Sequence, residues 1–276
     1  MTAPAPAVAP TAASKPVAKA STHTSVLWFA SARAIMRLTW ARTVTPMLLI
    51  GMAFLVILPM VFALVFAARG PLSGDPVQFL IGRYDQLVLS ISVPVLSLLL
   101  GTSAFAAESN DGTLIYLVTT TTPRWWIVLV RMMFSAALAA GLAGFSVWGT
   151  GRIATGPSDP MNVTLAFGAA AVLGAATYAA GFTAVALITK RALVGGLAYV
   201  LFWEGILSGT FPALHFLSVR QWMLAVAASI TDANARQLTT GPSVTAALIG
   251  AGIVVVFALM IATQRLARPR LSRIGN

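Results

Sequence analysis

Residues 108–131, ESNDGTLIYLVTTTTPRWWIVLVR, form a polar interruption between two long apolar runs. The segment begins with Glu108, ends with Arg131, and contains a short block compatible with a helix (residues 113–118) after Gly112. It is too short to fold as a separate domain, but long enough for one or two helical turns at a membrane surface. We therefore expect the chain to enter the membrane on both sides of this segment, and the segment to be accessible to a soluble partner.

The composition is that of an all-α membrane protein. The chain has 276 residues, of which 58% are hydrophobic and 9% charged, and its mean hydropathy is +0.86. Soluble domains carry about 25% charged residues. Cysteine is absent, which excludes disulfides, thiol catalysis and cysteine-based metal sites. The net charge of +11 comes from basic residues that flank apolar runs without forming a dense patch, so nucleic acid is not expected as a partner.

Six apolar runs are predicted to cross the membrane, because about 20 apolar residues are needed for a hydrocarbon core of about 30 Å. They are residues 47–68, 87–107, 123–149, 163–188, 192–208 and 243–263. Pro59 is expected to kink the first run. Pro123 is expected to be the first residue of the third run with Thr122 as its cap, and Arg131 to extend back to the headgroups. Ala170, Gly174 and Gly181 are predicted to share a close-packing face in the fourth run.

The remaining segments have distinct compositions. Residues 1–24 are rich in Ala, Pro and Thr and are predicted to be a disordered cytoplasmic tail. Residues 25–45 are predicted to form an amphipathic interfacial helix, anchored by Trp28, Arg33 and Arg37. The alternative is a basic extension of the first spanning helix.

Two further segments lie outside the six spans. Residues 69–86 are predicted to be a polar loop. Residues 210–240 contain apolar pieces too short to span, so we expect an external re-entrant or surface helical hairpin between spans five and six. The permease domain would thus cover residues 46–264, followed by a basic cytoplasmic tail, residues 265–276.

The distribution of basic residues predicts the orientation. Residues 1–46, residues 108–131, the pair Lys190-Arg191 and the C-terminal tail contain 13 of the 18 lysines and arginines. Because cytoplasmic loops carry an excess of these residues, both termini and residues 108–131 are predicted to be cytoplasmic.

No enzyme motif is present. The phosphate-binding pattern G-x-x-x-x-G-K-[ST] is absent, and so is the zinc-binding pattern H-E-x-x-H. We therefore predict no catalytic, cofactor-binding or metal-binding residues in this chain.

Glu204 is the one ionisable residue placed well inside an apolar run. A charge at the centre of a membrane helix costs at least about 2.5–3.5 kcal/mol, so Glu204 should face a partner or a cavity. It could contact substrate or gate a pathway; alternatively, it is a structural carboxylate bonded to a neighbouring helix.

The polar segment resembles the cytoplasmic segment between spans two and three of type-2 ABC exporter permeases. The residues that carry the similarity are Glu108, Asp111, Gly112, Thr113, Leu114, Leu117, Thr120, Pro123, Arg124 and Arg131. The family also has an amphipathic helix before span one, six spans and an external helical hairpin. An aromatic-Glu pair like Trp203-Glu204 recurs in part of it.

This resemblance implies a non-catalytic permease subunit in a bacterial inner membrane. A second permease copy or a related chain would complete the pathway among membrane lipids, with a possible accessory subunit. Two ABC ATPase subunits would bind ATP and Mg²⁺. The ATPase-coupling residues would be Glu108, Asp111, Gly112, Thr113, Leu114, Leu117 and Arg124. Two alternatives stay open: a secondary transporter, or a membrane anchor that recruits an ATPase without transport.

Overall fold

In the part of the chain that the computed structural model describes, all regular secondary structure is helical. The described residues are 32–33, 35–37, 39–40, 45–70, 74–110, 123–189, 191–207, 216–231 and 241–267. The α-helices are α2 (Pro46–Ala68), α3 (Pro76–Arg83), α4 (Val93–Asn110), α6 (Arg124–Thr155), α7 (Val163–Ile188), α8 (Ala192–Ala198), α10 (Val219–Ile230) and α11 (Val244–Ala267). Two π-helices, η2 (Tyr84–Ser92) and η4 (Tyr199–Leu207), continue α3 and α8, and a short 3₁₀ turn, η3 (Pro160–Asn162), precedes α7.

Within the described residues, five helices are long and apolar enough to cross a membrane, and the chain is a multi-pass helical membrane protein. They are Pro46–Ala68, Pro76–Phe105, Arg124–Thr155, Val163–Ile188 and Val244–Leu266. The fourth predicted run matches α7 residue for residue. The fifth predicted run is also helical, but its 16 residues from Ala192 to Leu207 cover only about 24 Å at 1.5 Å per residue. It is shorter than the other candidate spans.

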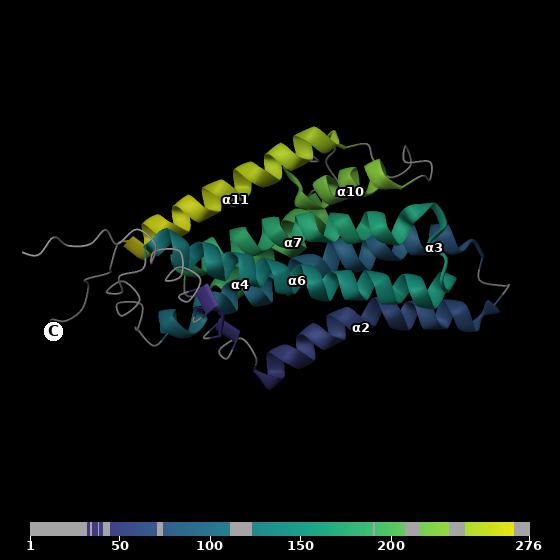
Figure 1. The fold of residues 1–276 in the computed structure, drawn as a ribbon, viewed down its shortest axis with the longest axis horizontal. Coiled ribbons are helices and arrows are strands. Elements are labelled where there is room, and N and C mark those ends of the chain that lie inside the picture. Colours follow the sequence, from purple (N-terminus) through teal and green to yellow (C-terminus); the bar gives the residue numbers. More distant parts are fainter. Residues whose placement is uncertain are drawn as a thin grey trace, which may run out of the picture.

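The long helices form one bundle around α7, which packs against α4, α6, α10 and α11. In Figure 1, α2 and α11 lie on opposite outer sides, with α4, α6 and α7 between them. The end of α2, the start of α3 and the turn from α6 to α7 lie at one end. The C-terminal end of α4, the start of α6 and the C-terminal end of α11 lie at the other end.

Side-chain hydroxyls attach α2 to the bundle where its proline interrupts the backbone hydrogen bonds. Pro59 has no N–H, so the carbonyl of Leu55 loses its helical donor. Ser92 Oγ donates to that carbonyl at 3.0 Å, and Ser146 Oγ donates to the carbonyl of Val56 at 2.8 Å. Ser92 thus satisfies the carbonyl that Pro59 frees, as a neighbouring helix must in a medium without water, and Ser146 provides an additional donor to Val56. Figure 1 shows α2 changing direction along its length, as Pro59 predicts.

The predicted polar loop at residues 69–86 is wrong over its second half, because α3 and η2 extend the second span back to Pro76. Asp75 caps this helix, and its side chain accepts a hydrogen bond from the N–H of Val77 at 3.0 Å. Tyr84 is fully buried and donates to the carbonyl of Val147 at 2.9 Å. Charged residues suggested a loop here, but Arg83 lies over the ring of Phe62, with 5.3 Å between its guanidinium and the ring centre.

The third span also differs from its prediction. α6 begins at Arg124, Pro123 occupies the cap position in an extended conformation, and Thr122 lies outside the described residues. The helix does not end near Gly149 but continues to Thr155. The polar residues of this last stretch can bond within the helix, since Thr155 Oγ1 donates to the carbonyl of Gly151 at 2.9 Å.

The described residues of the predicted interfacial helix are helical at positions 32–33, 35–37 and 39–40. Arg33 and Arg37 are exposed, whereas Trp28 and residues 1–24 lie outside the described residues. Trp40 packs edge-on against Phe134 of α6, with 6.3 Å between ring centres. The helical character is confirmed for these residues, and the position at a membrane surface stays a prediction.

Candidate functional site

Glu204, the one carboxylate predicted to lie in an apolar run, is buried in η4 with 3% of its surface exposed. It accepts hydrogen bonds from Ser218 Oγ at 2.6 Å, from the backbone N–H of Val219 at 3.1 Å and from the hydroxyl of Tyr199 at 3.4 Å. Ser218 is the N-cap of α10. Because the first N–H groups of a helix have no partner within it and carry partial positive charge, a carboxylate is well accommodated there.

A second carboxylate holds the same end of α10. Asp85 lies in η2 and receives a two-pronged ion pair from Arg220, in which Nη2 is 2.7 Å from both carboxylate oxygens and Nε is 3.1 Å from Oδ1. Both side chains are partly buried. The π-helix is rare and frequently occurs at functional sites. Here two π-helical segments each supply a carboxylate to the first residues of α10.

The position of α10 within the bundle follows from its contacts with α7. Met223 packs at Gly174, where a Cβ on the glycine would lie 2.0 Å from Met223 Sδ. Gly174 lies eleven residues after Val163, about 16 Å along a helix of about 39 Å. At the C-terminal end of α10, Thr231 Oγ1 donates to the carbonyl of Met161 at 2.9 Å, next to the turn between α6 and α7. α10 therefore begins near mid-depth and runs outward.

This arrangement bears on the predicted hairpin at residues 210–240. One helix of it, α10, enters the bundle, while residues 210–215 and 232–240 lie outside the described part of the chain. Of the predicted close-packing face, Ala170 and Gly174 are buried, whereas a side chain at Gly181 would meet nothing within 4 Å. The absence of a side chain at Gly174 allows Met223 of α10 to pack closely against α7.

Arg131 is buried near the opposite end of the bundle, with 1% of its surface exposed. Its Nη1 donates a hydrogen bond to the carbonyl of Ala104, and its guanidinium carbon lies 4.6 Å from the ring centre of Phe105. One turn further along α6, Ser135 Oγ donates to the carbonyl of Leu100 at 3.1 Å. The prediction that Arg131 extends to the headgroups is wrong, because α4 offers a carbonyl and an aromatic face within its reach.

Of the predicted ATPase-coupling residues, the structure describes only Glu108 and Arg124. Glu108 lies in the last turn of α4 and its side chain is not described, and Arg124 is half-buried as the first residue of α6. The other predicted coupling residues, Asp111, Gly112, Thr113, Leu114 and Leu117, lie outside the described residues. Their roles stay predictions.

No known family profile or curated protein matches this chain. Among the described residues, no group of three or more His, Asp or Glu side chains is placed to hold a metal ion. The main chemical feature of the arrangement around α10 is a pair of carboxylates, the buried Glu204 and the partly buried Asp85, that bind the first residues of α10.

Sequence reasoning selected Glu204 but missed Asp85 and Arg220, because both appeared to lie in loops. One signal could have placed Asp85 in a helix: Asp75-Pro76 is a cap followed by a proline at the first helical position. No local signal reveals the partner of Arg220, which is 135 residues away.

Proposed function

We propose that this chain is the permease subunit of an ATP-driven exporter, coupled to separate ATPase subunits through residues 108–124. The observation that best supports this is the attachment of α4 to α6 by Arg131 and Ser135. These two helices are the ones that residues 111–122 connect. A force applied to the connecting segment would therefore move the two helices together.

Packing offers a route for such a movement. α4 and α6 both pack along α7, and α7 packs against α10. The first turn of α10 is held by Glu204 and Asp85 through hydrogen bonds that a relative shift of the helices would break. In the proposed mechanism, closure of ATPase subunits bearing ATP and Mg²⁺ displaces α4 and α6, and α10 changes position at the other end. The exposed apolar faces of α2 and α11 would meet lipid or a second permease copy.

One observation favours a secondary transporter as a second candidate. Ion-coupled transporters place ionisable groups at broken helices near mid-depth. Glu204 lies in η4 and accepts a hydrogen bond from the start of α10, and neither helix is long enough to span alone. In that case transport would follow an ion gradient and continue without ATP.

The proposed function is tested by purification of the full chain in mild detergent from its native membrane. We expect an ATP-hydrolysing subunit to co-purify in equal number. Leu114→Asp should reduce its recovery roughly 30-fold, the effect of losing an interface residue that contributes about 2 kcal/mol. Gln264→Asp is the matched control, because Gln264 is exposed near the end of α11, at the end of the bundle where α4 ends and α6 begins.

Sidedness is tested with the same preparation, since the chain contains no cysteine. A cysteine introduced by Tyr116→Cys should react with an impermeant maleimide only from the cytosolic side. Labelling from the outer side, or purification without any nucleotide-hydrolysing partner, would refute the proposal. Normal partner recovery with Leu114→Asp would refute the assigned contact.

A further inference from the structure

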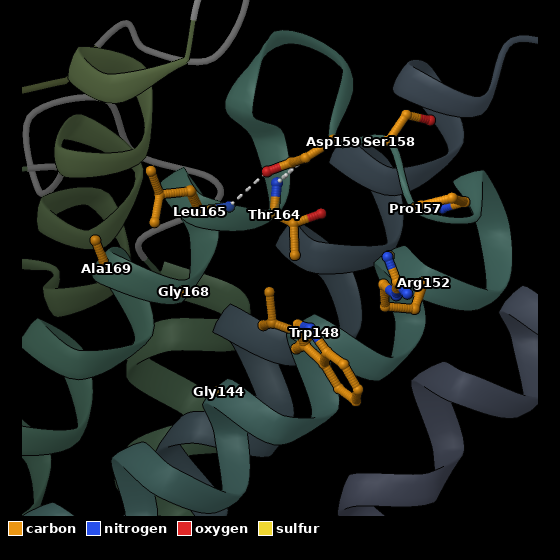
Figure 2. A pocket seen from close by; sticks show the side chains of 12 residues that line it. Gly144, Trp148, Arg152, Pro157, Ser158, Asp159, Thr164, Leu165, Gly168 and Ala169 are labelled. Atoms are coloured by element: carbon orange, nitrogen blue, oxygen red, sulfur yellow. Dashed lines mark hydrogen bonds between the residues drawn. The ribbon is translucent and has the colours of Figure 1, made fainter.

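A hollow of ≈ 470 Å³ lies between α6 and α7, beside the turn that joins them. Its apolar wall includes Gly144, Gly168 and Ala169, and Arg152 and Asp159 lie nearer the turn (Figure 2). A Cβ built at Gly144 or Gly168 would meet nothing within 4 Å. The hollow thus exists because these positions of both helices carry no side chain.

The charged residues of the hollow have opposite signs and are not paired with each other. Asp159 Oδ1 accepts from the N–H of Thr164 at 2.9 Å and Oδ2 from the N–H of Leu165 at 3.1 Å, as Figure 2 shows. Each carboxylate oxygen still has capacity for a further hydrogen bond. In the described part of the chain no carboxylate lies within ion-pair distance of Arg152, whose guanidinium carbon lies 6.0 Å from the ring centre of Trp148.

The surroundings favour a lipid as the occupant. Trp148 is 55% exposed beside Arg152, and tryptophan and arginine near helix ends are typical of the membrane–water interface. Gly144 lies eight residues before Arg152, about 12 Å further along α6 toward the membrane interior. The hollow therefore presents charges at headgroup level and an apolar wall at the depth of the acyl chains.

We propose that this hollow binds a phospholipid whose headgroup carries both a phosphate and a primary ammonium. The phosphate pairs with Arg152, the ammonium donates to Asp159, and one acyl chain lies against Gly144 and Gly168. A phosphatidylglycerol headgroup offers no cation to Asp159. A phosphatidylcholine headgroup has a cation without N–H donors. Phosphatidylethanolamine satisfies both side chains.

The test uses the full-length protein, delipidated in detergent and titrated with phosphatidylethanolamine, phosphatidylglycerol or phosphatidylcholine of identical acyl chains. Native mass spectrometry measures the bound fraction. We expect phosphatidylethanolamine to bind roughly tenfold more tightly than the other two, which corresponds to about 1.4 kcal/mol. This binding does not depend on transport or on an ATPase, so its failure would leave the proposed function standing.

Substitutions test the roles of the two charged residues and of the apolar wall one at a time. Arg152→Gln should weaken the binding of all three lipids, because each carries a phosphate, and Arg152→Lys should restore part of the binding. Asp159→Asn should remove the preference for phosphatidylethanolamine. Gly144→Leu should fill the hollow and weaken all three lipids. Arg69→Gln and Gly252→Leu are matched controls, because Arg69 is exposed at the same end and Gly252 is an open helical position on α11.

Equal binding of the three lipids would overturn the proposal, as would equal effects of Arg152→Gln and Arg69→Gln. The effect of Asp159→Asn on the fold is checked by thermal unfolding, since Asp159 also caps α7. If that variant does not fold, the comparison of Gly144→Leu with Gly252→Leu and the lipid preference of the unmodified chain decide the outcome.

Discussion

Gly174→Ala should destabilise the protein because it fills the space that Met223 occupies. The new Cβ would lie 2.0 Å from Met223 Sδ and 3.1 Å from Val93 Cγ1. Met223 is fully buried, so it cannot swing into solvent. Overpacking a tight core costs about 1–3 kcal/mol. Alanine also recovers about 0.5–1 kcal/mol of helix propensity relative to glycine. The expected net loss is therefore about 1–2 kcal/mol.

The matched control is Gly181→Ala on the same helix, where the added methyl meets nothing within 4 Å. This variant should keep or slightly raise the free energy of unfolding. Both variants can be measured by titrating mixed micelles with sodium dodecyl sulfate and following helicity by circular dichroism.

A double variant identifies the partner of the clash. Met223→Ala removes the side chain that the new methyl meets, so Gly174→Ala combined with Met223→Ala should be more stable than the sum of the single losses predicts. Coupling between residues in contact is typically about 0.5–3 kcal/mol. If Gly174→Ala behaves like Gly181→Ala, or if no coupling is measured, α10 does not pack against α7 at this depth and the account of a re-entering helix fails.

Two further predictions concern the carboxylates that hold α10. Glu204→Ala should lower the free energy of unfolding by about 1–3 kcal/mol, because it leaves buried donors without an acceptor. Glu204→Gln keeps one carbonyl oxygen and should lower the free energy of unfolding by less. Equal losses in the two variants would contradict the capping role. Asp85→Ala and Arg220→Ala should each destabilise in the same micelle titration, with a coupling energy of about 0.5–3 kcal/mol because the side chains are in contact. The exchanged pair, Asp85→Arg with Arg220→Asp, should recover part of the loss, whereas strict additivity of the single variants would show that the ion pair contributes nothing.

The sequence by itself determined where the chain is helical and apolar. The run from Val163 to Ile188 is α7 to the residue, and the first run begins at Pro46, one residue before its predicted start. This succeeds because backbone hydrogen bonds in a membrane must be made within each helix, so length and hydropathy decide the element locally. The prediction for residues 76–86 failed because charged residues were counted as solvent-exposed.

Only the tertiary structure decided what each buried polar group contacts. Glu204 could be recognised as buried, but not as the cap of α10. Arg131 was expected at the surface, and Asp85 and Arg220 in loops. Their partners come from other helices, and the Asp85–Arg220 pair joins residues 135 positions apart. Hydropathy is a local property of the chain. The pairing of charges depends on which helices pack together, and that depends on the shapes of all the packing faces in the bundle.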